Sequence, residues 1–486
     1  MSRFVLTVLA LAAAADVAGA GGLERDAPAS PRPGVTAARP FTPPALQERT
    51  LANGLHVVAA RRGTVPRFTV QLVFEGAGLA ADPAGRIGLA AFTADALLEG
   101  TATRSSEQIR QEAFGMGGSI AASSAHDFSV IEAGGLSEFM PDLLRLVADV
   151  AQNPSFPEQE LASLRTRALQ TLLQQQASPQ FLSHRAFRAA LFGDHPYGRL
   201  APREEDLKAL DRGAIAAFHA GVYRPEHATL IVVGNVDAAD VFAAAEAALG
   251  GWRGTGVRVA PLPPAASPTE RRLVFVHRPG SVQSSISFGN TTVRRSDPRW
   301  YAVSVTNSLM GGSFNSRLTR KLREEKGYTY SPLSQFSALA DAGVYRFAAD
   351  VRNEVTGAAI TDMQAEMERL QADGADAQEL TDIKQYARGL FSIRMAASDL
   401  VADDLLAVYV FDLPRDYLST YQSRISAVTP DDVRQAARLL VTPDRSVLAI
   451  AGDWNAVKEQ LAGYPDIRFV DEKGAAAEAP ATRQAP

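Results

Sequence analysis

Two segments in different halves of the chain follow one pattern. Pro225–Asn235 and Pro443–Asp453 each open on a turn-forming proline, continue as a β-type apolar run and end in Gly-Asn or Gly-Asp. At 486 residues the chain is too long for one ordinary hydrophobic core. A pattern that recurs in both halves of the chain therefore indicates a duplicated domain, and we expect two similar domains in tandem.

A proline-rich stretch separates the two expected domains. Residues 256–270 contain four prolines, Pro261, Pro263, Pro264 and Pro268. Proline at this density supports neither a helix nor a central strand. We therefore place a linker at 256–270, an N-terminal domain at 45–255 and a C-terminal domain at 271–471. Residues 21–44 are predicted to be a flexible leader and residues 472–486 a disordered tail.

The N-terminus has the pattern of a secretory signal peptide. Arg3 is followed by the apolar run Phe4–Ala15 and then by the small residues Ala18–Ala20, which suit a cleavage site. The run is too short to span a bilayer, and no later stretch is long and apolar enough to do so. We predict a signal peptide at residues 1–20 and a periplasmic or secreted protein, with a retained anchor as the alternative.

Short strands and longer helices alternate irregularly along the chain. Residues Arg67–Glu75 and Val282–Gly289 have β-rich alternation. Helical periodicity is clear in Met140–Asn153, Glu158–Gln176 and Ile360–Ala372. Because no regular βαβ rhythm connects these elements, we expect an α+β fold rather than a doubly wound parallel sheet.

Several motifs occur in an order that resembles the pitrilysin/insulinase peptidase family, over about residues 46 to 470. The motifs are Leu51–Leu55, Gly88–Thr101, Asp194–Arg199, Tyr223–Gly234 and Gly311–Tyr330. The resemblance implies two duplicated domains of the mitochondrial-processing-peptidase-like metallohydrolase type. Each would be a mainly antiparallel sheet packed with helices.

The resemblance places a degenerate zinc site in the first domain. Active members carry H-x-x-E-H after the Gly-Leu-Ala of this frame. Here the two histidine positions hold Ala91 and Asp95, and the glutamate position holds Ala94. The third ligand, a glutamate seven residues after Glu160 in the frame, is replaced by Arg167. A methyl group offers zinc no lone pair and a guanidinium repels it, so we expect no metal in this chain.

In the second domain the resemblance points to Arg323 and Tyr330. They match an arginine and a tyrosine that face the zinc across the closed chamber of active members. Both side chains can donate hydrogen bonds to a scissile carbonyl and stabilise its oxyanion. Tyr328 is the less suitable partner. The alternative is a charged helix end with local ion pairs.

Two further departures bear on binding in the first domain. Peptide-cutting members carry asparagine on the edge strand where the substrate lies, and Ala121 takes that position. Pairing along an edge strand needs only backbone groups. Asp95 and Glu99 fall at i and i+4 and could share a cation, although a paired or solvated face is commoner.

Other function classes lack their signatures. The chain has no cysteine, and no G-x-S-x-G elbow or phosphate-binding loop is present. His195, in the H-P-Y-G segment, is predicted to be a turn residue. The net charge is −5, with no long basic run, so nothing indicates nucleic-acid binding.

The resemblance implies a non-catalytic subunit of a heterodimeric zinc peptidase. A zinc-bearing homologue would be its partner, extended peptides its substrates, and Arg323 and Tyr330 its contribution to the site. No metallopeptidase activity is expected of the chain alone. The alternative is a catalytically inactive structural or peptide-binding module, and a hydrolase acting alone would need a constellation that we do not find.

Overall fold

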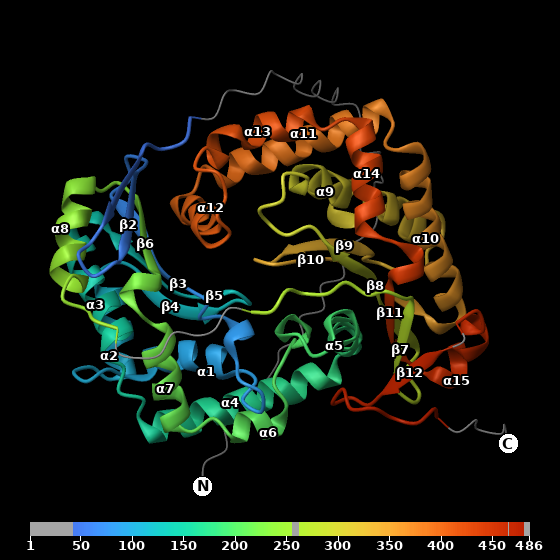
Figure 1. Cartoon of the computed structure of the whole chain (residues 1–486), viewed down its shortest axis with the longest axis horizontal. Coiled ribbons are helices and arrows are strands. Elements are labelled where there is room, and N and C mark those ends of the chain that lie inside the picture. The colour runs from blue at the N-terminus through green and yellow to red at the C-terminus, as the bar shows by residue number, and fades with distance from the viewer. Residues whose placement is uncertain (1–41, 255–261, 465, 481–486) are drawn as a thin grey trace, which may run out of the picture. The chain divides into compact units, whose positions relative to one another are not determined.

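The computed structural model describes residues 42–254, 262–464 and 466–480 (Figure 1). They form a first half (residues 42–254) and a second half (residues 262–480), each built on a six-stranded sheet with helices packed against it. This arrangement confirms the predicted α+β class and the duplication. The predicted signal peptide and nearly all of the predicted leader lie outside the described residues.

The first sheet has the strand order β1-β2-β6-β3-β5-β4. Its strands are β1 (Leu46–Thr50), β2 (His56–Arg61), β3 (Arg67–Glu75), β4 (Ser119–Ser124), β5 (Phe128–Leu136) and β6 (Ala228–Gly234). All neighbours are antiparallel except β2 and β6. Strand β4 is an edge of this sheet, which places Ala121 on an edge strand as predicted.

The second sheet has the order β12-β7-β11-β8-β10-β9 and repeats the first except at its edge, where β12 is parallel to β7. Its strands are β7 (Arg272–His277), β8 (Gln283–Thr292), β9 (Leu333–Ala338), β10 (Gly343–Arg352), β11 (Val447–Gly452) and β12 (Ile467–Val470). The repeated sequence segments form β6 and β11. Each is buried throughout and lies between one parallel and one antiparallel neighbour.

The helices of the first half follow the apolar periodicity of the sequence. They are α1 (Leu89–Ala96), α2 (Ser106–Gly115), α3 (Met140–Gln152), α4 (Glu158–Ala177), α5 (Pro179–Phe192), α6 (Glu204–Lys208), α7 (Arg212–Val222) and α8 (Ala238–Leu249). Helix α4 begins directly after Pro157 and has Glu158 and Glu160 in its first turn, where carboxylates complement the helix dipole.

The second half has α9 (Trp300–Asn307), α10 (Thr356–Asp373), α11 (Ala377–Arg394), α12 (Ser398–Val410), α13 (Tyr417–Ala427), α14 (Pro430–Leu440) and α15 (Trp454–Val457). Helix α10 begins at Thr356, before the predicted start at Ile360. Among the described helices none combines the length and apolarity needed to cross a bilayer.

One helix of each half packs against the sheet of the other half. Helix α5, from the first half, packs against β7, β8 and β11, and α12, from the second half, packs against β3 and β6. Phe187 of α5 is fully buried in a cluster that includes Val274 and Ala449 of the second sheet. The two halves therefore share hydrophobic cores, which opposes their separation in solution.

The segments outside the two sheets differ in part from expectation. Residues 262–270, the described part of the predicted linker beyond 261, contain no helix or strand. The predicted tail was expected to be disordered from residue 472, but residues 472–477 turn back onto β12. The N–H of Ala477 donates to the carbonyl of Phe469 at 3.0 Å. Backbone pairing, rather than an apolar pattern, holds this turn, and the disorder of the tail stays a prediction; residues 481–486 lie outside the described part.

Candidate functional site

Helix α1 presents one face to a cavity. Its first turn is capped by the buried carboxylate of Asp82, which accepts hydrogen bonds from the N–H groups of Gly88 at 2.6 Å and Ala90 at 2.7 Å. Gly88 has φ = 92°, a left-handed conformation that favours glycine. One side of the helix enters the core, so Ala91 and Asp95, one turn apart, lie on the cavity side.

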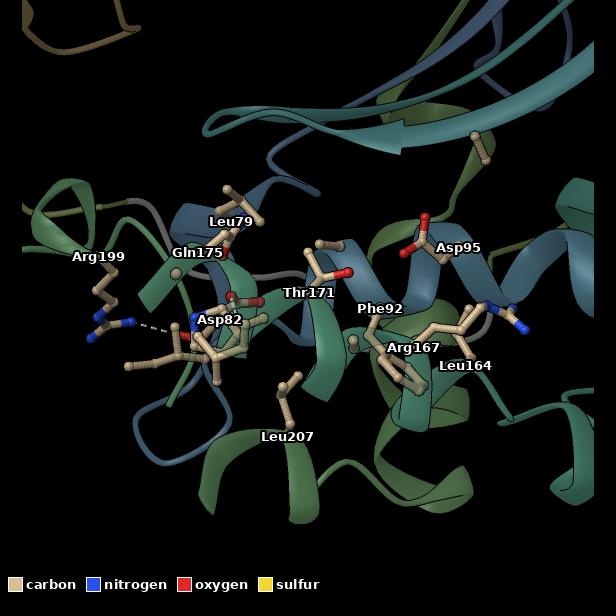
Figure 2. Close-up of a pocket in the computed structure, with 18 of the residues that line it drawn as sticks. Leu79, Asp82, Phe92, Asp95, Leu164, Arg167, Thr171, Gln175, Arg199 and Leu207 are labelled. Carbon is tan, nitrogen blue, oxygen red and sulfur yellow. Dashed lines mark hydrogen bonds between the residues drawn. The ribbon is translucent and has the colours of Figure 1, made fainter. Parts of the chain in front are cut away.

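The cavity has a volume of about 520 Å³ and lies between α1, α4 and residues 199–207 (Figure 2). Its wall includes Ala91, Asp95 and Arg167, so the structure brings three of the four degenerate zinc-site positions together. Much of the remaining wall is apolar, with Leu79, Phe92, Leu98, Leu164, Leu172 and Leu207. The fourth position, Ala94, is buried and does not line the cavity.

An ion pair occupies the predicted third-ligand position. The Nη2 atom of Arg167 lies 2.8 Å from Oε1 of Glu99, which is only 6% exposed, and Nη2 of Arg110 lies 3.8 Å from the same oxygen. Glu99 is thus paired with two arginine side chains. In the part of the chain that the structure describes, no three His, Cys, Asp or Glu side chains are grouped to hold a metal ion. These residues do not fit zinc, which needs three protein ligands in a catalytic site.

Asp95 is expected to titrate well above the ordinary range. Partial desolvation beside the cavity wall raises the pKa of this carboxyl from 3.8 to about 6, although Asp95 is an exposed residue; nearby Arg167 opposes the rise and Glu99 adds to it. Because a cation stabilises the ionised form, Arg167→Gln should raise the pKa further. A ¹³C NMR titration of the carboxyl, assigned with Asp95→Asn, measures both values.

The same shift sets a pH dependence of stability. The folded chain holds the proton of Asp95 more tightly than the unfolded chain, so this stabilisation is present below pH 3.8 and is lost as the pH rises to about 6. Relative to Asp95→Asn, the unaltered protein should lose unfolding free energy across this window. A carboxyl that titrates near 4 in both the unaltered and the Arg167→Gln proteins would contradict the assignment.

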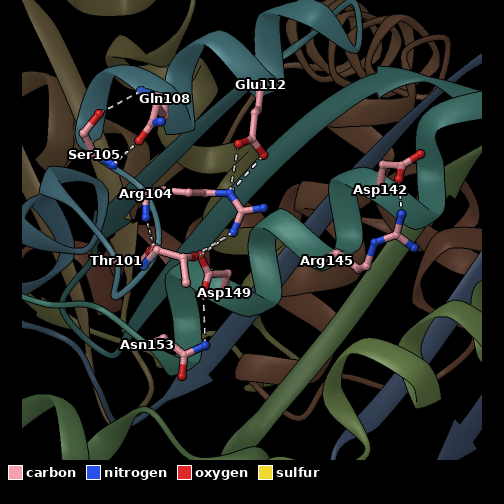
Figure 3. Close-up of polar contacts among 10 residues, drawn as sticks. Thr101, Arg104, Ser105, Gln108, Glu112, Asp142, Arg145, Asp149 and Asn153 are labelled. Carbon is pink, nitrogen blue, oxygen red and sulfur yellow. Dashed lines mark hydrogen bonds and ion pairs between the residues drawn. The ribbon is translucent and has the colours of Figure 1, made fainter.

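The residues that close the α1 frame have a structural role. Thr101 Oγ1 accepts a hydrogen bond from the N–H of Arg104 at 3.0 Å, and Ser105 caps α2 in a reciprocal box with Gln108 (Figure 3). The guanidinium of Arg104 then bridges Glu112 and Asp149, each at 2.9 Å. This network fixes the segment after α1 to α2 and α3.

Arg323 and Tyr330 lie in contact, but away from the α1 cavity. The guanidinium carbon of Arg323 is 4.5 Å from the ring centre of Tyr330 and 5.2 Å from that of Phe314. This cation–π stack is at the surface, with Tyr330 77% and Phe314 69% exposed. Neither Arg323 nor Tyr330 lines the α1 cavity. Sequence reasoning did not single out Phe314, although it lies within the Gly311–Tyr330 motif.

The backbone around this stack is locally unusual. Residues Ser308–Gly312 and Thr319–Glu325, which include Arg323, form two π-helical turns, a conformation frequent at functional sites. A Cβ atom on Gly311 would lie 2.4 Å from the backbone N of Ser334 in β9. The glycine is therefore required by close packing against β9. Tyr328 packs partly buried against the core of the second half.

His195 sits in a turn, in keeping with its predicted role. Its Nδ1 accepts a hydrogen bond from the N–H of Tyr197 at 3.1 Å, and its Nε2 lies 2.9 Å from the carbonyl oxygen of Pro263. Because the second nitrogen approaches an acceptor, it serves as the donor. The histidine thus ties the H-P-Y-G turn to the segment that follows residue 261.

The duplicated sheet-and-helix fold, together with an α1 frame that has Ala91 and Asp95 at the two histidine positions of the zinc motif, defines a peptidase-like class of protein. Residues 56–201 match the family model described as insulinase (peptidase family M16), and residues 209–386 match that of the peptidase M16 inactive domain. The chain belongs to peptidase family M16. It is 31% identical over 305 residues to an uncharacterized zinc protease of Mycobacterium tuberculosis, Rv2782c, covering 62% of this chain and 68% of that one.

Solved structures share the fold. The peptidase M16 inactive domain from Pseudomonas fluorescens superposes with a TM-score of 0.79 at 26% identity, over 84% of this chain and 98% of that one. The periplasmic protease PqqL from Escherichia coli matches with a TM-score of 0.72 at 18% identity, over 91% of this chain and 49% of that one. The second likeness concerns the fold alone.

Proposed function

We propose that this protein is the non-catalytic subunit of a heterodimeric zinc peptidase. The observation that carries the proposal is the ion pair between Arg167 and buried Glu99, which puts a cation where the family's third zinc ligand is expected. With Ala91 and Asp95 at the two histidine positions, hydrolytic power has to come from another chain. A zinc-bearing homologue of this family is the proposed partner.

In this proposal the second half contributes to substrate binding. The partner holds the zinc ion that activates the attacking water. The Arg323 guanidinium and the Tyr330 hydroxyl donate hydrogen bonds to the scissile carbonyl of an extended peptide, as the family resemblance implies. The high exposure of Tyr330, 77%, supports the proposal because it leaves the ring accessible to a ligand.

The second candidate function is an inactive peptide-binding or structural module. The largely apolar cavity over α1 favours it, because an apolar wall with a few charged groups is typical of ligand sites. In this case the Arg323–Tyr330 stack would only stabilise the π-helical turns. The two candidates differ in whether the chain raises the activity of a zinc-bearing partner.

We further propose a periplasmic location. The signal-peptide pattern of residues 1–20 supports it, and so does the absence of cysteine, which avoids stray thiols in an oxidising compartment.

Co-expression tests the heterodimer directly. Three preparations are compared: the mature chain alone, an H-x-x-E-H homologue from the same genome alone, and the two chains produced together. We expect the chain to copurify with the homologue. The mixture should hydrolyse unstructured peptides at a rate well above that of the homologue alone, and the chain alone should not hydrolyse them. Zinc analysis should find metal only in preparations that contain the homologue. Full activity of the homologue alone would favour the inactive module.

A further inference from the structure

A second cavity, of about 230 Å³, lies where the two halves meet. The turn between β4 and β5 contributes Ala125–Phe128, α5 contributes His184 and Arg188, and β10 contributes Arg346. Strand β9 and the residues after it, together with Leu200 and Phe411, complete the wall. The cavity is thus lined by two arginines and, with His126 in the β4–β5 turn, two histidines.

Neither arginine has an ion-pair partner among the described residues. Arg188 is 3% exposed and donates to the carbonyl oxygen of Tyr197 and to Nε2 of His126, both at 2.9 Å. Arg346 donates to Oγ of Ser287 at 3.2 Å and to Oε1 of Gln335 at 2.7 Å. All of these acceptors are neutral.

The acidic groups near the arginines are engaged elsewhere. The carboxylate of Asp127, in the cavity wall, accepts hydrogen bonds from the Tyr197 hydroxyl and from the N–H of Ala340. Asp350, which attracts Arg346 at longer range, accepts from Gln180 and Ser285. Asp127 likewise attracts Arg188 without a direct ion pair. A guanidinium that is not hydrogen-bonded to a carboxylate is energetically costly to bury, so both arginines can still accept a carboxylate partner.

The histidines do not supply that counter-charge and do not add positive charge. Burial, aided by the arginines, lowers the pKa of His126 to about 4 and that of His184 to about 3. Arg188 can only donate, so Nε2 of His126 must accept and the ring is neutral at this nitrogen. Near neutral pH the cavity wall therefore holds two permanent cations, two neutral imidazoles and the carboxyl of Asp127, which is already hydrogen-bonded to Tyr197 and Ala340.

We propose that this cavity binds a carboxylate of a peptide held by the chain, either a C-terminal carboxylate or an Asp or Glu side chain. Guanidinium groups recognise carboxylates by paired hydrogen bonds. The volume is below the range typical of drug-sized ligands and suits a side-chain-sized group. Residues 125–128 directly follow edge strand β4, so a peptide paired with β4 can extend to the cavity. The inference rests on the proposed peptide-handling function.

Four fluorescent peptides of one unstructured sequence test this site by fluorescence anisotropy. They combine a C-terminal carboxylate or amide with a central Glu or Gln. We expect the mature chain to bind a carboxylate-bearing peptide about tenfold more tightly than the neutral peptide, the effect of one charge-assisted hydrogen-bonded contact. If the C-terminal carboxylate strengthens binding, the cavity binds a peptide C-terminus; if the central Glu does so, the cavity binds an acidic side chain.

The matched variants are Arg346→Met, in the cavity, and Arg468→Met, on the exposed part of β12 in the same sheet. The preference for the carboxylate-bearing peptide should disappear in Arg346→Met and persist in Arg468→Met. Arg346→Lys, which keeps the charge, should show an intermediate preference. Equal binding of all four peptides, or an unchanged preference in Arg346→Met, overturns the carboxylate site and leaves peptide handling intact. No binding of any peptide overturns both this site and peptide handling by the isolated chain. Thermal unfolding verifies that each variant folds.

Discussion

Replacing Tyr330 by phenylalanine should lower the peptidase rate of the reconstituted complex roughly a hundredfold, because loss of one oxyanion donor costs about 2.7–4 kcal/mol of activation free energy. The substitution removes one hydroxyl and keeps the ring that stacks 4.5 Å from the Arg323 guanidinium. Tyr330 is 77% exposed, so no packed core is disturbed. Steady-state hydrolysis of a fluorogenic peptide by the complex measures the effect.

Tyr328→Phe is the matched control for this prediction. The variant loses the same hydroxyl two residues away, on a ring that packs against the core of the second half. The peptidase rate of this variant should stay within about twofold of that of the unaltered complex. The Tyr328 hydroxyl makes no contact with the oxyanion in this proposal, so its loss affects only local stability. An unchanged rate in Tyr330→Phe would refute the oxyanion role and favour the inactive peptide-binding or structural module.

Much of the fold could be predicted from the sequence, because the local sequence pattern agrees with the final structure. Strand β3 has the predicted bounds Arg67–Glu75, and α4 begins at Glu158 as its proline and acidic residues indicate. The exchange of α5 and α12 between the halves was not predicted. Apolar periodicity shows that Phe187 enters a core, but it does not show which sheet supplies that core.

The candidate site could be predicted only where spacing along one helix or motif defines it. Ala91 and Asp95 share the cavity face of α1 because they are one turn apart. The pairing of Arg167 with Glu99 joins α4 to the end of the α1 segment, and the cavity near Arg346 joins distant segments of both halves. Such contacts depend on tertiary packing, which no local pattern encodes.

Restoring three ligand side chains should give the chain a zinc site. Ala91→His and Asp95→His place two imidazoles one turn apart on the cavity face of α1, and Arg167→Glu replaces the guanidinium with a carboxylate. Three such ligands are what a catalytic zinc requires. We expect the triple variant to keep about one zinc per chain through dialysis, measured by plasma mass spectrometry, whereas the unaltered chain keeps none. Arg110, 3.8 Å from Glu99, remains as a partner for that carboxylate.

The double variant Ala91→His with Asp95→His isolates the contribution of Arg167. It has both imidazoles, but it lacks the third ligand and keeps a permanent cation beside them, so its zinc affinity should be at least about a hundredfold weaker. Equal affinity of the double and triple variants would mean that residue 167 does not occupy the third-ligand position. If the triple variant binds no zinc, the α1 cavity is not a degenerate zinc site, and its apolar wall becomes the stronger guide to function.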